Sequence, residues 1–217
     1  MALLVAAGSA QARPETVSQT FEYTGKPGGG LVINAGDPVG LAVSGEFIAA
    51  RAGERLVAVS IGLNISGGYN GDYFAFLRSP NGTIVTLINQ PGTDMFGSPA
   101  SGFGNGSANS FVLSASALQN IQNVDGTYGQ AMTGSFSAAG DLNAFGTLAR
   151  PQDDANGSWE LFIDNLGSGG GSGKLESWTI TEQVVAAPEP LYVVPGLLLV
   201  AGSLAALRLK RLSLESE

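Results

Sequence analysis

The chain of 217 residues contains no cysteine and no histidine. Ser-His-Asp and Cys-His nucleophiles need an imidazole base, so the sequence excludes both. Zinc enzymes depend on histidine and cysteine ligands, and disulfides need cysteine pairs, so neither zinc catalysis nor disulfide bonding is expected. Only carboxylate or lysine chemistry remains available for catalysis, and we expect no catalytic residues.

Charged residues are also scarce, at 13% of the chain, and the net charge is −8. The basic residues cluster at the C-terminus, so residues 13–190 hold seven basic and sixteen acidic side chains, a net charge of −9. An acidic surface repels phosphate backbones, and we therefore expect no nucleic-acid partner.

The 32 glycines, together with frequent asparagine and serine, indicate short strands joined by turns. The clearest strand is 56–65, where branched aliphatic residues occupy every second position from Val57 to Ile65. This period of two buries one face of the strand and predicts an all-β fold, a jelly-roll-like antiparallel β-sandwich. Further strands are expected near residues 31–33, 39–43, 73–78, 83–88, 111–113, 159–164 and 175–182.

Two turns are expected between the strands of the first half. Asn70-Gly71 tolerates positive φ at both positions, and residues 79–82 read Ser-Pro-Asn-Gly. With these turns, strands 56–65, 73–78 and 83–88 are predicted to form a meander.

The two ends of the chain read as targeting segments. Residues 1–12 are apolar and end in Ala10-Gln11-Ala12, which fits a signal peptide whose basic start is truncated. The sandwich is expected over 13–183 and a linker over 184–190. Residues 191–207 form an uncharged apolar run, about 25 Å long as a helix, that predicts a transmembrane helix. The basic tail, 208–217, is then expected to be cytoplasmic.

Two segments carry a family resemblance. Residues 67–83 read GGYNGDYFAFLRSPNGT and residues 157–180 read GSWELFIDNLGSGGGSGKLESWTI. They resemble the P domain (P/Homo B domain) of kexin- and subtilisin-like proprotein convertases over roughly 21–182. The matching residues are Tyr69, Gly71, Asp72, Ser79, Pro80, Gly82 and Thr83 in the first motif, and Gly157, Trp159, Leu161, Asp164, Gly173, Leu175 and Trp178 in the second.

The resemblance implies a jelly-roll sandwich that packs against a subtilisin-type catalytic domain and stabilises it. The sequence departs from the family at Gly67, where the family has histidine, and at 169–172, which lack the family's acidic residue. No residue of a catalytic domain is found in the sequence, so the resemblance does not imply endopeptidase activity.

The tail resembles the PEP-CTERM sorting signal of Gram-negative bacteria. Pro188-Glu189-Pro190 precedes the apolar run, and Arg208, Lys210 and Arg211 follow it. This resemblance implies export, a cytoplasmic-membrane tether, and processing by an exosortase that leaves the protein at the periplasmic face, at the cell surface or outside the cell. It also implies a setting with exopolysaccharide or an envelope protein as the partner.

Asp72 and Asp164 lie at strand ends beside loops and are the candidate ligands of a calcium ion, which prefers six to eight oxygens. Turn-capping is the alternative role for both. Glu160 and Asp164 could form a glycosidase-like acid pair, but nothing else in the sequence supports one. No other cofactor is expected.

Four aromatic residues are candidates for stacking on a sugar ring. Trp159 and Trp178 lie in alternating strand patterns and are expected in the core. Tyr69 and Tyr73, at a turn, are the better candidates for exposed stacking on a sugar ring. The sequence therefore favours an exported, envelope-sorted, non-catalytic sandwich with a structural or adhesive role. An accessory module of a subtilisin-like serine protease and a carbohydrate-binding module are the alternatives.

Overall fold

The computed structural model describes residues 14–23, 29–48, 54–92, 109–124, 131–146 and 156–186. All of them lie in one compact unit, and they form strands and short 3-10 helices. The elements are β1 (Glu15–Glu22), β2 (Leu31–Ile33), β3 (Leu41–Phe47), β4 (Glu54–Gly67), η1 (Asn70–Asp72), β5 (Tyr73–Arg78), β6 (Ile84–Asn89), β7 (Asn109–Ser114), η2 (Ile121–Asn123), β8 (Thr133–Phe136), η3 (Leu142–Phe145), β9 (Gly157–Asn165) and β10 (Gly173–Ala186).

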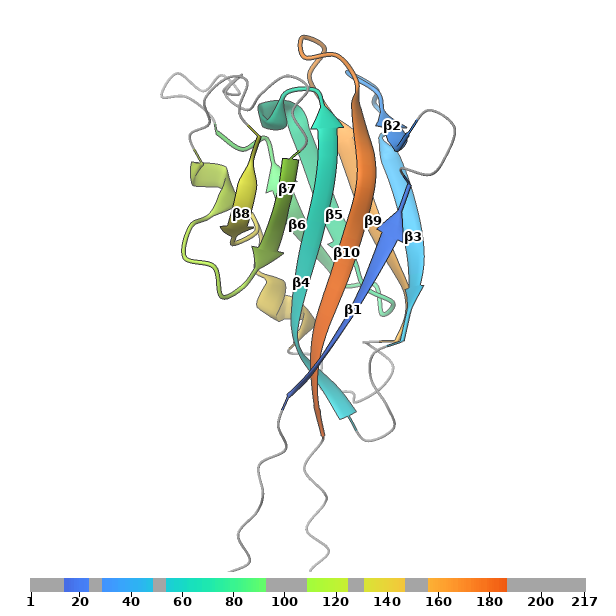
Figure 1. The fold of residues 1–217 in the computed structure, drawn as a ribbon, viewed down its shortest axis with the longest axis vertical. Coiled ribbons are helices and arrows are strands. Elements are labelled where there is room, and N and C mark those ends of the chain that lie inside the picture. The colour runs from blue at the N-terminus through green and yellow to red at the C-terminus, as the bar shows by residue number, and fades with distance from the viewer. Residues whose placement is uncertain are drawn as a thin grey trace, which may run out of the picture. The chain divides into compact units, whose positions relative to one another are not determined.

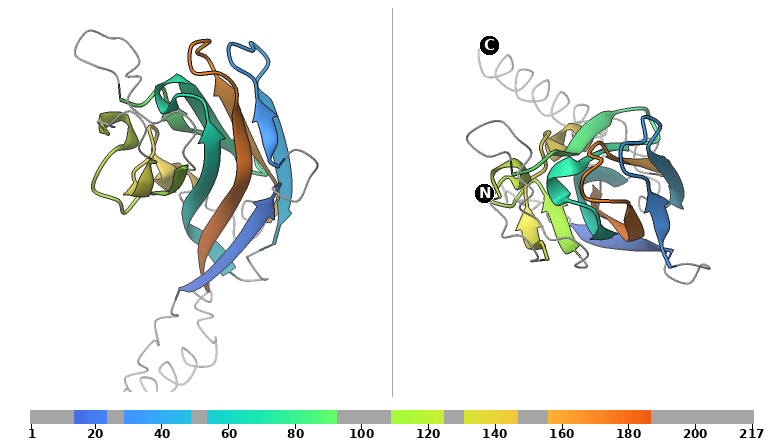
Figure 2. Two further views of the ribbon diagram at one scale, coloured as in Figure 1. Left: turned by 45° about the horizontal axis from the view of Figure 1, so that its top comes forward. Right: turned by 90° about the horizontal axis from the view of Figure 1, so that it is seen from above.

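The strands form two sheets packed face to face, which confirms the all-β sandwich (Figures 1 and 2). Sheet A has the order β1-β10-β4-β7-β8, with β2 also paired to β10, and sheet B has the order β3-β9-β5-β6. The pairing is antiparallel except between β7 and β8, which run parallel. The expected antiparallel pairing therefore does not extend to that edge of sheet A.

The predicted meander is also wrong, because β4 belongs to sheet A whereas β5 and β6 belong to sheet B. The chain changes sheets between Gly67 and Tyr73 instead of folding back beside β4. Asn70-Gly71 lies in η1, and the positive φ angles fall at Gly67 (74°) and Gly68 (62°). The consecutive strands β4 and β5 therefore lie in opposite sheets.

The core lies between the sheets and contains both tryptophans. Trp159 of β9 and Trp178 of β10 are completely buried, so the predicted core role is confirmed for each. Phe21 of β1 stacks on Trp178 with ring centroids 4.6 Å apart. The same ring covers Gly45 of β3, whose missing side chain would begin 2.2 Å from it. Phe21 therefore joins the edge of sheet A to the edge of sheet B.

The long strands β4 and β10 form the centre of sheet A, with Leu63 opposite Trp178 and Ile61 opposite Ile180. The alternation predicted for 56–65 holds from Val59 to Ile65, all of whose aliphatic members are buried. Val57 departs from it, because the register shifts where Gln183 faces Ala58 and Val184 faces Leu56. A β-bulge at Val57 turns Leu56 inward in its place.

The last strand of the sandwich ends slightly later than residue 183, the expected end of the domain. β10 continues to Ala186, so the first residues assigned to the 184–190 linker belong to a strand, and Val184 is buried. Residues 1–12, the Pro188-Glu189-Pro190 motif, the predicted span at 191–207 and the basic tail lie outside the described residues. Among the described residues there is no helix of the length and hydropathy needed to cross a membrane.

Candidate functional site

The outer surface of sheet B carries a cluster of phenylalanines that we call the aromatic face: Phe74 and Phe76 of β5 and Phe162 of β9. In both strands the alternate residues, such as Ala75 and Ile163, are completely buried, so the phenylalanines point away from the core. Phe76 lies directly opposite Phe162 in the ladder between the strands. Each of these three phenylalanines is half-buried.

The rings of the aromatic face contact one another in two ways. Phe76 and Phe162 are stacked, with centroids 4.8 Å apart and planes 12° from parallel. Phe74 meets both edge-on, at 6.3 Å from Phe76 and 6.4 Å from Phe162. Such pairs contribute roughly 0.5–1.5 kcal/mol beyond the area they bury, so the cluster has a defined shape.

Gly40, just before β3, makes room for Phe162. Its φ of +66° suits glycine, and a Cβ there would lie 2.5 Å from the Phe162 ring. Ala42, which faces Phe162 in the β3–β9 ladder, is small and exposed. The Phe162 ring therefore packs on the backbone of Gly40, and Ala42 adds no large side chain on the β3 side of the aromatic face.

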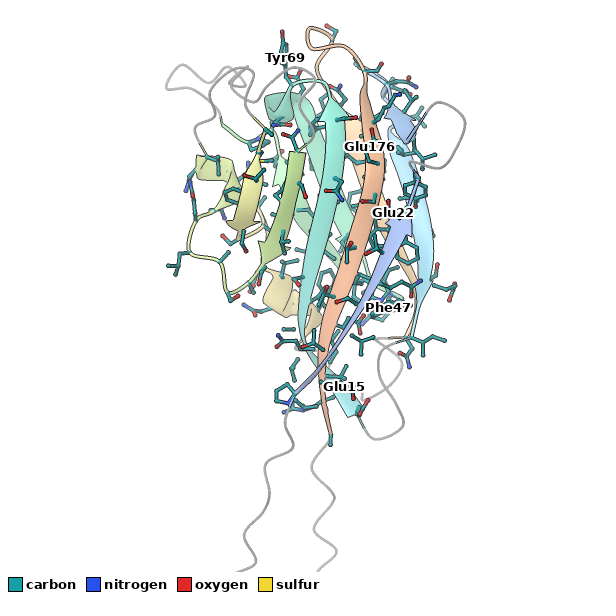
Figure 3. All side chains as sticks on the ribbon, viewed as in Figure 1. Glu15, Glu22, Phe47, Tyr69 and Glu176 are labelled. Atoms are coloured by element: carbon teal, nitrogen blue, oxygen red, sulfur yellow. The ribbon has the colours of Figure 1, made fainter. Side chains whose placement is uncertain are left out.

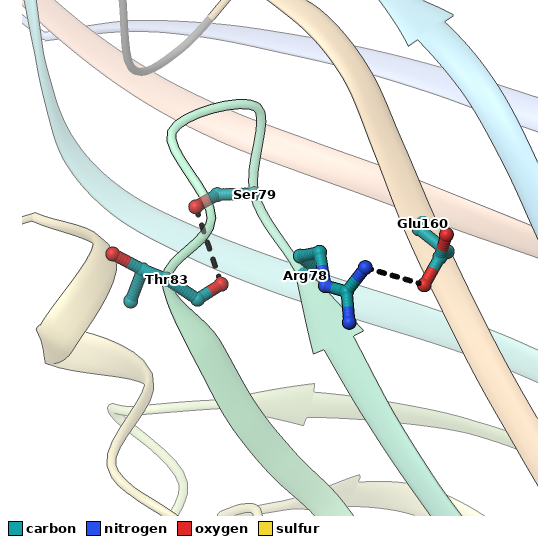
Figure 4. A network of polar contacts seen from close by, with 4 residues as sticks. All are labelled: Arg78, Ser79, Thr83 and Glu160. Carbon is teal, nitrogen blue, oxygen red and sulfur yellow. Dashed lines mark hydrogen bonds and ion pairs between the residues drawn. The ribbon is translucent and has the colours of Figure 1, made fainter.

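A charged pair borders the aromatic face at the β5–β6 turn (Figure 4). Nη1 of Arg78 lies 3.4 Å from Oε1 of Glu160, and the guanidinium lies 6.0 Å from the centre of the Phe76 ring. Both side chains are partly exposed, so the pair adds little stability and serves to neutralise this border. The adjoining turn is tight, since the Ser79 hydroxyl donates a hydrogen bond of 3.3 Å to the Thr83 carbonyl.

Asp164 borders the aromatic face at its other end, opposite Phe74 in the β5–β9 ladder. It is 5% exposed, and its Oδ1 has no hydrogen-bond partner among the described residues. Burial raises the pKa of this carboxyl group, a hydrogen bond from the Asn165 backbone offsets part of that rise, and the nearby carboxylate of Asp37 adds to it. Asp37 itself accepts a hydrogen bond of 3.0 Å from the Val39 backbone N–H.

Asp72, the other predicted calcium ligand, ends η1 at the same end of sheet B. Its backbone carbonyl accepts a hydrogen bond of 2.8 Å from the Leu166 N–H, and its carboxyl group lies against Gly167. Burial raises its pKa. No group of three or more acidic residues in the described part of the chain is arranged to hold a metal ion. The calcium site at Asp72 and Asp164 stays a prediction.

The candidate acid pair, Glu160 and Asp164, does not have a geometry suitable for glycoside hydrolysis. Glu160 and Asp164 both point outward from β9 and are four residues apart, roughly 13 Å along a strand. The paired carboxyl groups of glycosidases lie about 5–9.5 Å apart. Phe162 stands between the two acids, and Arg78 engages Glu160, so the pair cannot act on one bond.

The two tyrosines that are candidates for sugar stacking differ in their burial. Tyr73 is 1% exposed, and its hydroxyl donates a hydrogen bond of 2.9 Å to the Gly67 carbonyl, so a stacking role for Tyr73 is wrong. Tyr69 lies at the end of the sandwich beside the β9–β10 loop (Figure 3). Its ring packs against Gly170 and is half-buried.

The aromatic face is not among the sites predicted from the sequence, although the pattern that indicates it is visible there. Phe74, Phe76 and Phe162 all occupy the outward positions of strands whose inward positions are aliphatic. An outward phenylalanine is unusual on a solvated strand, and only the pairing of β5 with β9 brings these phenylalanines together. Contiguous apolar side chains on a surface mark contact sites, and phenylalanine is enriched in protein interfaces.

No protein-family model matches the chain, and no curated protein matches it significantly. Among solved structures, the chain is similar to the Aeromonas sobria serine protease in complex with the chaperone ORF2, with a TM-score of 0.47 and 12% identity. It is also similar to the serine protease of Aeromonas sobria, with a TM-score of 0.43 and 16% identity. Each match covers 82% of this chain and 28% of the solved chain, so the chain spans less than a third of their length.

Proposed function

We propose that this chain is a non-catalytic module that binds a partner protein through the aromatic face, and that the partner is a serine protease of the subtilisin type. The observation that carries the proposal is the half-buried cluster of Phe74, Phe76 and Phe162 on the outer surface of sheet B. Interfaces are anchored by such aromatic clusters, which lose their remaining contact with water when a partner covers them.

The ring geometry favours a protein over a sugar as the ligand of this face. A sugar ring stacks on an open, flat aromatic surface, but Phe76 and Phe162 cover one face of each other. Phe74 is inclined by 64° and 65° to its neighbours, so the cluster presents an uneven surface. The apolar side chains of a partner protein can fill the hollows of such an uneven surface, whereas a flat sugar ring cannot.

The choice of a subtilisin-type protease rests on the motif resemblance to the P domain. The second motif forms β9 and the start of β10, and its Trp159 and Trp178 form the centre of the core. The end of the first motif forms the β5–β6 turn, where Gly82 has a φ of 89°. The motif residues thus have structural roles in this chain, and the resemblance to the P domain is what suggests the class of partner.

The test is recovery of the partner by the full-length chain carrying an affinity tag in its native host. Binding is supported if mass spectrometry identifies a protein with a subtilisin-type catalytic domain. The double variant Phe76→Thr, Phe162→Thr keeps strand propensity and should lose that protein. Thr86→Val, next to Phe76 but outside the cluster, is the matched control and should retain it. Equal recovery by all variants, or recovery of no such protease, contradicts the proposal.

We further propose that the chain is exported and sorted through its C-terminal tail, which is compatible with either a protease-accessory or an adhesive role. The tail sequence supports this proposal through Pro188-Glu189-Pro190, the apolar run at 191–207 and the basic residues after it. Intact-mass measurement in host strains with and without the exosortase gene tests it. Processing near the motif that depends on the gene is expected, and a mature protein that keeps residues 191–217 in both strains contradicts exosortase processing.

A further inference from the structure

A hollow on the outer surface of sheet A lies away from the aromatic face. It has a volume of about 310 Å³ and opens over β4, β7, β10 and η3. This volume is at the lower end of the range for small-ligand sites. The lining residues are Ala58, Val59, Ser60, Ser114, Ala115, Ser116, Asn143, Thr181 and Gln183.

The floor of the hollow is a row of hydroxyl groups that crosses the sheet. Thr181 of β10 pairs with Ser60 of β4, and Ser60 pairs with Ser114 of β7. Because paired residues point to the same face, the hydroxyls stand side by side at the spacing of adjacent strands, about 4.8 Å. The row continues at one end to Ser18 of β1, whose hydroxyl lies 2.8 Å from that of Thr181.

The walls are polar and uncharged. Ser116 stands beside Ser114, with their hydroxyl oxygens 2.9 Å apart, and Asn143 comes from η3, which packs against β4. Gln183 continues the β10 side, opposite Ala58. The lining therefore combines hydroxyl and carboxamide groups with small apolar surface, and the described residues that form it include none with a charged or aromatic side chain.

We infer that this hollow binds one unit of a neutral carbohydrate. Hydroxyls and carboxamides both donate and accept hydrogen bonds, which matches the hydroxyl groups of a sugar. A charged ligand would find no opposite charge among the lining residues that the structure describes, and an apolar ligand would leave their polar atoms without partners. Binding by hydrogen bonds alone, without an aromatic platform, is expected to be weak, on the order of millimolar for a single sugar.

The experiment is saturation-transfer NMR on the full-length chain with methyl glycosides of glucose, galactose and mannose. At least one of them should bind. The variant Thr181→Val removes a floor hydroxyl while keeping the shape of the side chain, and it should weaken binding by about tenfold or more. Thr179→Val is the matched control, because Thr179 lies on the same face of β10 and makes an equivalent 2.8 Å contact with Thr20 outside the hollow.

Each outcome decides the inference. Binding that is lost in Thr181→Val and kept in Thr179→Val supports it. Failure of every neutral glycoside, equal loss in both variants, or equally tight binding of glucuronate overturns it. Sugar binding in the hollow is measured independently of protease recovery through the aromatic face, so either proposal can fail while the other holds.

Discussion

The carboxyl group of Glu182 on β10 lies opposite Val59 on β4, and both side chains point into the core of the sandwich. On its other side Glu182 faces Val17 of β1. The side chain is completely buried, and neither carboxyl oxygen has a hydrogen-bond partner among the described residues. An unpaired carboxylate in such a place is costly, so the carboxyl group keeps its proton.

We predict that stability falls as pH rises because of Glu182. Burial raises its pKa from 4.5 to about 8, so the folded protein keeps a proton that the unfolded chain has already released. The full stability is present below pH 4.5 and is lost between there and pH 8, at up to about 1.4 kcal/mol per pH unit. Urea unfolding at several pH values measures this loss.

The free energy of unfolding of the Glu182→Gln variant should no longer show the part of the fall with pH that Glu182 causes. Glu46→Gln, at an exposed glutamate of β3, is the control and should follow the wild type. If wild type and Glu182→Gln show the same slope between pH 5 and 8, Glu182 is not the titrating group. A replacement by leucine should be more stable than wild type at pH 8.

We predict that Gly45→Ala is destabilising, by roughly 1–3 kcal/mol. A Cβ at this position would lie 2.2 Å from the Phe21 ring, and that ring is held against Trp178. In an open strand, alanine in place of glycine would instead be neutral or slightly stabilising. Ser44→Ala, at the exposed neighbouring position, is the control for thermal unfolding, and equal melting temperatures for the two variants would contradict the packing.

We predict that Tyr73 and Gly173 are energetically coupled. A Cβ at Gly173 would lie 1.8 Å from the Tyr73 hydroxyl oxygen, so Gly173→Ala should be strongly destabilising. Tyr73→Phe alone should cost about 1 kcal/mol, because the hydrogen bond to the Gly67 carbonyl is lost. The double variant should recover part of the loss, and a double-mutant cycle by urea unfolding measures the coupling. Strictly additive effects would show that the two residues do not meet.

We predict that millimolar calcium raises the melting temperature of the full-length chain if the ion binds at Asp72 and Asp164, at the end of sheet B. The buried Oδ1 of Asp164 and the raised pKa values of Asp72 and Asp164 are features that a bound cation would relieve. Asp164→Asn should abolish the calcium response, and Asp141→Asn, on an exposed turn, should keep it. An unchanged melting temperature of the wild type with calcium excludes the site.

Several features follow from the sequence alone. The absence of histidine and cysteine excludes whole classes of catalysis, because the side chains are missing wherever the chain places them. The period-two pattern around Ile61 and the alternation around Trp159 and Trp178 identify strands and their buried faces, since side-chain direction alternates in any strand. Local turn chemistry likewise identifies the turn at Ser79-Pro80-Asn81-Gly82, where the Gly82 N–H donates a hydrogen bond of 2.9 Å to the Ser79 carbonyl.

The sequence did not reveal β1, which is rich in polar residues and is held as an edge strand by its ladder with β10. Nor did it reveal which strands pair. β4 joins β10 from the far end of the domain, whereas its neighbour in the sequence, β5, enters the other sheet. Such pairing depends on contacts distant in the chain, which no local pattern encodes.

Both proposed sites depend on that pairing. Phe76 and Phe162 stack only because β5 lies beside β9, and Thr181 meets Ser60 only because β10 lies beside β4. The sequence by itself determined which side chains face outward along most of each strand, because direction alternates there, but not at the bulge, where Leu56 and not Val57 turns inward. The tertiary structure decided which of them became neighbours, because sheet order and register are set by the packing of the whole core.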